Sequence, residues 1–296
     1  MISGDVLPEN VDFFNAIRTL TEVTIYLLML PLKWHRKFQS KPYVRTMEAW
    51  GKIFTLSKIY VTEKLRELSQ RAVRGEAVND GSFIAFLMIQ DKLSPEEIYS
   101  NMTELLTASV DTTSTTTLWC LHLLSKNPHV QEKLHEEVMR VLPEDVNPTR
   151  DQINNMPYLK AVIKETLRLF PITQGTARVL PKDLIIRNYH IPAGTAVQTF
   201  FYGSGNDTSI FEHAAEFKPE RWLDGSCKNL GFASQPFGFG TRMCLGRRLA
   251  EQEMYLIMSQ ISRRFIIEPT KDNIDHVCKV LIIPDQPLEL KFIDRK

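Results

Sequence analysis

Cysteine is scarce in this chain, and its placement argues against several classes of site. The 296 residues include four cysteines, at positions 120, 227, 244 and 278. No two of them form a C-x-x-C pair, which argues against zinc ribbons and thioredoxin-like redox motifs. Four cysteines in a chain of this length also make a poor disulfide framework. We therefore expect Cys120, Cys227 and Cys278 to be plain thiols, and Cys244 alone to carry chemistry.

Long apolar runs and an excess of one charge are also lacking. The most apolar stretch, Ile25 to Leu32, is far shorter than the roughly 20 residues that span a bilayer. The early acidic residues Asp5, Glu9 and Asp12 are atypical of a secretory signal or an Arg-rich transit peptide, so we expect neither a membrane anchor nor a targeting segment. Lysine and arginine number 36 against 35 for aspartate and glutamate, and the net charge of +1 gives no reason to expect a nucleic-acid partner.

The residue pattern predicts a mostly α fold with a minor β component, in a single domain over residues 1–296. No linker, internal repeat or low-complexity tract divides the chain. Helical patterns run to about Arg74, and residues 74–81 read as a loop. Further helices are expected over residues 94–127, from Pro128 to near Pro143, between Pro157 and Phe170, and from just after Cys244 to about Phe265. Short strands are expected over residues 177–202, with turns at 187–188 and 193–194, and a C-terminal hairpin has Pro284 and Pro287 at its turn.

The helix expected over residues 94–127 has strong start signals and an unusual interior. Ser94 can cap it, Pro95 suits the first helical position, and Glu97 completes a capping box. Its length of about 33 residues exceeds the usual range. Residues 112–117 are all threonine or serine, which are poor helix formers because their hydroxyls compete for backbone carbonyls. We therefore expect a local bend or bulge there.

The strongest motif is F-G-F-G-T-R-M-C-L-G at residues 237–246. It places Phe237, Gly240, Arg242, Cys244 and Gly246 at the spacing of the haem-ligand signature of cytochrome P-450, and the chain resembles that family from about residue 13 onwards. The resemblance implies the C-terminal part of the cytochrome P-450 fold. It also implies haem b (iron protoporphyrin IX) as the cofactor, with Cys244 as the proximal ligand to iron.

Each residue type in this motif has a physical reason. A thiolate at Cys244 would push electron density onto iron, and a helix that starts just after it would favour the charged sulfur. Gly240 and Gly246 allow turns that bring backbone close to the sulfur. Arg242 suits a charge-assisted bond to a haem propionate. The alternative is a buried cysteine in a glycine-rich loop. By resemblance, the haem-binding set also includes Phe237, Gly238 and Arg178; the alternative for Arg178 is an exposed strand residue.

A second motif is Glu165-x-x-Arg168, whose two side chains share one helix face and can pair. The alternative is a solvated surface pair. Downstream, the sequence P-E-R-W at residues 219–222 resembles the second arginine motif of the family, which implies that Arg221 joins Glu165 and Arg168 in a buried charge triad. Such a triad would fix the geometry of the core rather than take part in chemistry.

The run Thr107 to Thr117 resembles the oxygen-binding groove of the family, in which an acid–alcohol pair corresponds to Asp111 and Thr112. The resemblance implies that this pair holds water and relays protons to oxygen bound at the haem. The family usually has glycine where this chain has Ser109, so extra bulk could narrow the oxygen site. The alternative is a polar helix face packed against a loop. The segments 172–176 and 280–282 would line the substrate pocket.

Four cations could form a docking patch for an electron donor: Lys160, Lys164, Arg247 and Arg248. This pattern looks like the mitochondrial class, which takes single electrons from an acidic [2Fe–2S] ferredoxin, and complementary charge would steer that encounter. The alternatives are ordinary solvated lysines and, as donor, a flavin reductase at the endoplasmic reticulum.

The segment Tyr26 to Phe38 sets leucine and methionine beside Lys33, Trp34, Arg36 and Lys37. Apolar residues flanked by basic and aromatic ones suit a peripheral contact with anionic lipid, although a buried helix end with a charged rim would read the same way. By resemblance, the location would be the matrix side of the mitochondrial inner membrane.

The resemblance predicts a haem-thiolate monooxygenase that hydroxylates a lipophilic, possibly sterol-like substrate. Family members normally have a long N-terminal part that has no counterpart in these 296 residues, so we expect a single incomplete domain. Two alternatives stay open. The chain could be a catalytically incompetent fragment or regulatory isoform, with apolar surface exposed. It could also be a haem-thiolate isomerase that needs no external electrons, although the Asp111-Thr112 pair argues against that.

Overall fold

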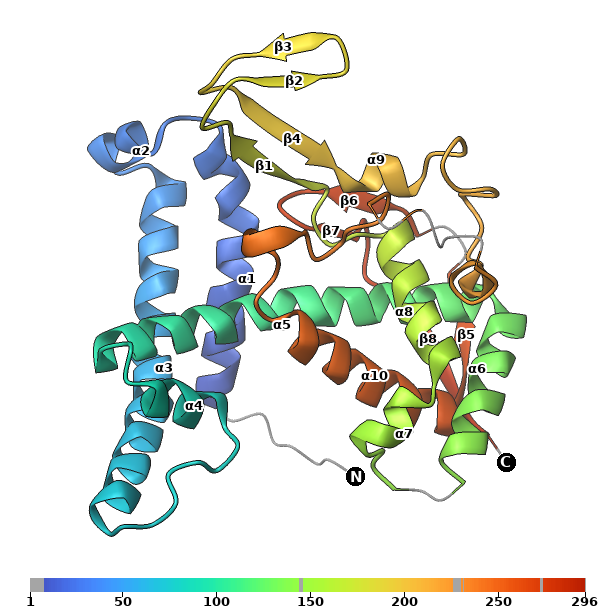
Figure 1. The fold of residues 1–296 in the computed structure, drawn as a ribbon, viewed down its shortest axis with the longest axis horizontal. Coiled ribbons are helices and arrows are strands. Elements are labelled where there is room, and N and C mark those ends of the chain that lie inside the picture. Colours follow the sequence, from blue (N-terminus) through green and yellow to red (C-terminus); the bar gives the residue numbers. More distant parts are fainter. Residues whose placement is uncertain (1–7, 144–145, 226–229, 231, 272–273, 296) are drawn as a thin grey trace. The chain divides into compact units, whose positions relative to one another are not determined.

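The computed structural model describes residues 8–143, 146–225, 230, 232–271 and 274–295 (Figure 1). Helices dominate, and all strands of the described part lie in two-stranded ladders, so the predicted mostly α fold with minor β is confirmed. The chain divides into two compact units, Met1–Asp111 and Thr112–Lys296, with the boundary inside one long helix. The prediction of a single domain stays a prediction.

The first unit is helical, as the pattern up to residue 74 predicts. It contains α1 (Pro8–Leu28), α2 (Leu32–Phe38), α3 (Lys41–Val73), α4 (Phe83–Gln90) and the first half of α5 (Pro95–Lys126). Helices α1 and α3 pack on each other through a buried cluster that includes Ile17, Leu20 and Ile53. Helix α4 had no sequence prediction, although Ser82 marks its start by accepting a 3.2 Å hydrogen bond from the Ala85 amide.

No single helix of the described ranges is long and apolar enough to cross a membrane. The helical segments Val11–Leu28 and Leu32–Phe38 are bent by 108° relative to each other, and they reach the length and apolar composition of a membrane span only when the two are taken together.

Helix α5 begins as predicted. The Ser94 amide donates to Glu97 Oε2 at 2.8 Å and the Glu97 amide donates to Ser94 Oγ at 3.2 Å, which completes the capping box. The predicted bulge at residues 112–117 is wrong, because α5 stays α-helical from end to end. The hydroxyls of Thr116 and Thr117 donate at 2.9 Å to the carbonyls four residues earlier, so the helix accommodates them as second donors.

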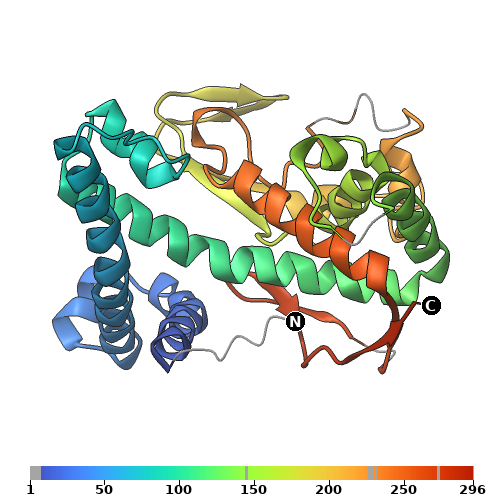
Figure 2. The same ribbon diagram turned by 90° about the horizontal axis from the view of Figure 1, so that it is seen from below.

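In the second unit, α6 (Pro128–Val141), α8 (Pro157–Leu169) and α10 (Arg247–Arg264) gather along the C-terminal half of α5 (Figure 2). Their shared core includes the fully buried Trp119, Leu134, Leu159 and Met258. The shorter helices are α7 (Arg150–Asn154), α9 (Phe201–Gly205) and the 3-10 turns η1 (Pro219–Trp222) and η2 (Gly240–Arg242). The predicted boundaries of α6, α8 and α10 are confirmed to within a few residues.

Four antiparallel ladders complete the second unit: β1 (Gly175–Val179) with β4 (Ala196–Phe200), β2 (Leu184–Ile186) with β3 (Tyr189–Ile191), β5 (Phe265–Pro269) with β8 (Leu290–Asp294), and β6 (His276–Cys278) with β7 (Ile282–Pro284). The predicted turns at 187–188 and 193–194 are confirmed. The predicted C-terminal hairpin is wrong in detail, because its turn lies at residues 279–281 and Pro284 ends β7.

The two segments that the resemblance assigns to the substrate pocket lie against each other. The Ile282 amide donates to the Ile172 carbonyl at 2.9 Å, and the Ile282 carbonyl accepts a 3.0 Å bond from Trp119 Nε1. The Trp119 ring stacks on Phe170 with 3.9 Å between ring centroids. These contacts fix the end of α8 and the β6–β7 hairpin to the buried face of α5.

Candidate functional site

The Cys244 loop has the tight backbone that its glycines predict. The Cys244 amide donates to the Phe237 carbonyl at 2.8 Å and the Met243 amide donates to the Gly240 carbonyl at 3.1 Å. Gly238 and Gly240 have φ values of +72° and +74°, a conformation that side chains with a Cβ rarely adopt. Gly246 does not need this freedom, since its φ is −81° and an added Cβ would have open space. It is instead the N-cap of α10, so this helix starts three residues after Cys244.

The surroundings of Cys244 fit an apolar macrocycle with acidic substituents. The Cys244 thiol is free and exposed, and Arg242 is exposed beside it. Large apolar side chains of the loop and the start of α10 are also exposed, namely Phe232, Phe239, Met243, Leu245 and Leu249. Soluble proteins rarely leave such a patch uncovered without a ligand or partner. In the described part of the chain, no three His, Cys, Asp or Glu side chains lie close enough to hold a bare metal ion, whereas iron held by a macrocycle needs only one protein thiolate.

Cys120 and Cys278 are not part of this loop. Burial raises the pKa of the Cys120 thiol to about 12, which makes it inert, and burial also raises the pKa of Cys278. Cys227 lies outside the described residues.

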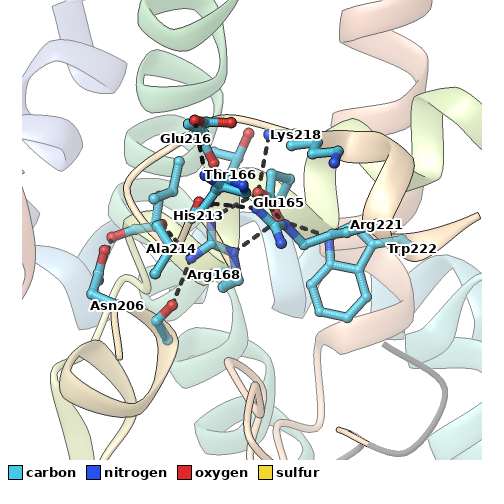
Figure 3. Close-up of polar contacts among 12 residues, drawn as sticks. Glu165, Thr166, Arg168, Asn206, His213, Ala214, Glu216, Lys218, Arg221 and Trp222 are labelled. Carbon is cyan, nitrogen blue, oxygen red and sulfur yellow. Dashed lines mark hydrogen bonds and ion pairs between the residues drawn. The ribbon is translucent and has the colours of Figure 1, made fainter. Parts of the chain in front are cut away.

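The structure brings Glu165, Arg168 and Arg221 together in a fully buried network (Figure 3). Glu165 Oε1 accepts from Arg168 Nη2 at 2.7 Å and from Arg221 Nε at 2.9 Å, while Oε2 accepts from Arg168 Nε at 2.9 Å. The Lys218 amide also donates to Glu165 Oε1 at 3.1 Å, and Trp222 Nε1 donates to Glu165 Oε2 at 2.9 Å. Sequence reasoning missed Trp222, although its place directly after Arg221 was a signal for it.

The remaining guanidinium donors of the triad bind backbone carbonyls. Arg168 donates to the carbonyls of Gly205, Ala214 and Glu216 at 2.6 to 3.1 Å. Arg221 donates to those of residues 212 and 213 at 2.9 and 3.2 Å. The triad therefore holds the irregular segment before η1 in place, which is a structural rather than a chemical task.

The hydroxyl-rich stretch of α5 offers polar groups in a partly buried setting. Asp111 accepts a short hydrogen bond from the hydroxyl of Thr21 in α1. The hydroxyl of Thr113 is buried and has no hydrogen-bond partner in the described part of the chain, which leaves it available to a water molecule. The hydroxyl of Ser109 donates to the Leu106 carbonyl at 3.0 Å, so it is turned back onto its own helix.

Arg178 lies in β1 with an exposed side chain. Its Nη1 donates to Thr176 Oγ1 at 2.6 Å and to the Ala177 carbonyl at 2.7 Å. Its predicted contact with a propionate stays a prediction.

The predicted docking cations divide into two kinds. Lys164 and Arg247 both line one cavity, where Lys164 Nζ lies 5.8 Å from the Trp222 ring centroid and the Arg247 guanidinium lies 5.5 Å from that of Phe237. Lys160 instead donates to the carbonyl and side-chain oxygens of Asn154 at 3.3 and 3.2 Å, and Arg248 is exposed on α10.

Comparison with known proteins identifies the family of the chain. The family model for cytochrome P450 matches residues 1–292. Cytochrome P450 27C1 of Danio rerio is 38% identical over 287 residues, which cover 96% of this chain and 52% of that protein. The mitochondrial sterol 26-hydroxylase of Homo sapiens is 34% identical over 98% of this chain and 56% of its own length. The mitochondrial cholesterol side-chain cleavage enzyme of Hypanus americanus is 33% identical over 95% and 54%. The chain spans about half the length of the curated relatives it matches, and it belongs to the cytochrome P450 family.

Proposed function

We propose that this chain forms the haem-thiolate part of a monooxygenase that inserts one atom of O₂ into a C–H bond of a lipophilic, sterol-like substrate, while two electrons from a donor protein and two protons reduce the other oxygen atom to water. The observation that carries the proposal is the Cys244 loop. Its thiol is exposed, its backbone turns at two glycines with positive φ, and exposed apolar side chains and Arg242 lie in the same loop. Membership of the cytochrome P450 family and relatives named as sterol and vitamin D hydroxylases support it.

The residues of the chain would divide the work as follows. Haem b, when bound, would supply the iron chemistry that activates oxygen. Cys244 would hold it from the proximal side and donate electron density from sulfur. Arg242 and Arg178 would bind the propionates. Asp111 and Thr112 would hold water and move protons at the Asp111 carboxyl and the Thr112 hydroxyl.

The Ile172–Ile282 contact supports the proposed substrate class, because it lies in the two segments that the resemblance assigns to the substrate pocket. Both residues are buried and aliphatic, and a pocket built beside them would favour apolar ligands over polar ones. The sterol and vitamin D substrates in the names of the relatives have the same apolar character.

We further propose an acidic [2Fe–2S] ferredoxin as the electron donor and the matrix side of the mitochondrial inner membrane as the location. Lys160, Lys164, Arg247 and Arg248 supply the charge for donor docking. Several relatives carry the word mitochondrial in their names. A flavin reductase at the endoplasmic reticulum is the alternative donor. Reversing Lys160 and Lys164 to glutamate should abolish ferredoxin-supported turnover by the haem-loaded protein, and unchanged turnover would remove the case for this donor.

The membrane contact proposed for residues 26–38 has a defined chemistry. Trp34 and Phe38 stack with ring centroids 5.7 Å apart, both are exposed, and Lys37 Nζ lies within 5.8 Å of each ring centroid. Leu28 and Met29, which precede α2 in the sequence, are also exposed. Exposed rings and aliphatic chains with an adjacent cation suit the headgroup boundary of an anionic bilayer. Trp34→Ser with Phe38→Ser should reduce co-flotation with cardiolipin-containing vesicles, and undiminished flotation would contradict the contact.

One measurement tests the enzymatic proposal. The chain is expressed with haem supplied, reduced and exposed to carbon monoxide, and its Soret band is recorded. A thiolate-ligated ferrous–CO band that is lost in Cys244→Ala is the expected result. A haem-loaded protein whose spectrum is the same with and without Cys244 would overturn the ligand assignment.

A second candidate is that these 296 residues alone take up no haem and act as a non-catalytic isoform. The exposed apolar side chains around Cys244 favour it, because a pocket with an open wall holds a prosthetic group weakly. Absence of haem uptake by this chain, under conditions in which the human sterol 26-hydroxylase takes up haem, would select this candidate.

A further inference from the structure

A cavity of about 400 Å³ lies where α8, η1, the loop before Cys244 and α10 meet. Its floor is apolar, since Ile163 and Leu167 are buried and the rings of Trp222, Phe237 and Tyr255 line its walls. Burial raises the pKa of the Tyr255 phenol to about 12, as expected for a poorly solvated wall. The size is in the range of sites that take a small ligand or a projecting side chain.

The rim of this cavity is positively charged. Lys164 is exposed and rests against the Trp222 ring. Arg247 rests against the Phe237 ring and forms a 2.9 Å ion pair with Glu251, which is the single carboxylate among the lining residues that the structure describes. With Lys164 held by a ring rather than by a carboxylate, the rim has positive charge left over for an acidic partner.

We propose that this cavity anchors an acidic electron-donor protein. One apolar or aromatic side chain of the donor enters between Trp222 and Phe237, and carboxylates beside it pair with Lys164 and Arg247. The inference rests on the proposed function, which requires such a donor, and it adds an apolar anchor to the charge attraction. Binding energy in protein interfaces concentrates in desolvated pockets of this kind, whereas rim charges mainly set the rate and the salt dependence of encounter.

The anchor is joined directly to the candidate iron ligand. The carbonyl of Phe237 accepts the 2.8 Å bond from the Cys244 amide, and the ring of the same residue walls the cavity. A donor side chain seated against that ring therefore contacts the residue that positions Cys244. Phe237 is thus a positioning residue shared by the docking surface and the Cys244 loop.

The test measures binding of this chain to an immobilised [2Fe–2S] ferredoxin by surface plasmon resonance at several salt concentrations. Ser234→Phe fills the cavity and keeps every rim charge. It should weaken binding about 10-fold or more and leave the dependence on salt unchanged. Ser234→Ala and Thr208→Phe, which places a new ring on an exposed turn away from the cavity, should bind like the wild type. Lys164→Glu should weaken binding and flatten the salt dependence.

Leu223→Trp fills the same cavity from another wall, and it decides the matter if Ser234→Phe fails to fold. Wild-type affinity in a folded cavity-filled variant would overturn the anchor, while a weakened Lys164→Glu would leave the charged docking patch intact. Absence of ferredoxin binding by the wild-type chain would also overturn the anchor, and the ferrous–CO spectrum then decides the proposed enzymatic function separately. Self-association that is lost in the filled variants would assign the cavity to a second copy of the chain and contradict a donor.

Discussion

Neutralising Glu165 should destabilise the second unit more than any isosteric change on its surface. Glutamine has the same shape as glutamate, so Glu165→Gln leaves no void. It removes the negative charge that two buried guanidiniums share at 2.7 to 2.9 Å, and it turns an amide NH₂ toward a ring of donors. All three residues of the triad are 4% exposed or less.

The expected size of the effect follows from this burial. Removing one partner of a buried ion pair costs about 3–5 kcal/mol because the remaining charge has no solvent. For a unit of this size, that loss corresponds to a fall in Tm of about 6–20 °C. A whole domain is stable by only about 5–15 kcal/mol, so this loss removes between about a fifth and all of that stability.

Urea and thermal unfolding followed by far-UV circular dichroism measure the change at one fixed pH. Glu268→Gln is the matched control, since its 3.2 Å pair with Lys291 is at least half exposed on both sides and is worth about 0–1 kcal/mol. If Glu165→Gln lost less than about 1 kcal/mol, the triad would not be the buried network that its geometry indicates.

Three further outcomes are expected. Glu137 accepts hydrogen bonds from the amides of residues 158 and 159 at 2.9 and 2.8 Å, yet burial raises its pKa, so the folded state binds the Glu137 proton more tightly than the unfolded chain does. The free energy of unfolding of the wild type should therefore fall as pH rises from the ordinary carboxyl range through the raised pKa. Urea titrations of Glu137→Gln should lack this pH-dependent component. Cys120 should resist alkylation at pH 8 while exposed Cys244 reacts, as peptide mass spectrometry would reveal, and equal rates would contradict the burial of Cys120. Gly175→Ala should destabilise the chain by about 1–3 kcal/mol, because the added Cβ would lie 1.7 Å from the Thr199 carbonyl oxygen. Gly51→Ala, in the middle of α3, meets open space and should stabilise the chain by up to about 1 kcal/mol. Calorimetry that finds the same stability for both variants would refute the packing of β1 on β4.

Capping and proline rules predicted the long helices well, because the start of a helix is determined by residues that are adjacent in the sequence. The Ser94–Glu97 capping box is one example, and the proline at the first position of α6 and α8 is another. The same rule would have found α7, since Thr149 and Gln152 form a capping box that was overlooked. The prediction of a bulge in α5 was wrong for a different reason. The hydroxyls of Thr116 and Thr117 donate to carbonyls that already accept a hydrogen bond within the helix, and composition alone does not predict that a carbonyl will accept two hydrogen bonds.

The features of the candidate site that lie within the Cys244 motif could be predicted from the sequence, whereas the contacts outside the motif could not. The glycine turns and the helix after Cys244 followed from residue types alone, but the role of Gly246 did not, since its backbone is ordinary. The partner of Lys160 and the ring beneath Lys164 depend on how α8 packs against its neighbours, which no local pattern encodes.

The two arginines of the triad hold the segment at residues 205–216 through main-chain oxygens, which every amino acid possesses. Residue identity at the exposed positions 212 and 216 is therefore free to drift over evolutionary time, while the number of residues is not. A single deletion would shift the oxygens past both cations at once. Substitutions at the exposed positions of this stretch should be tolerated, whereas changes in length, and changes at the buried Gly205, Phe211 and Ala214, should not.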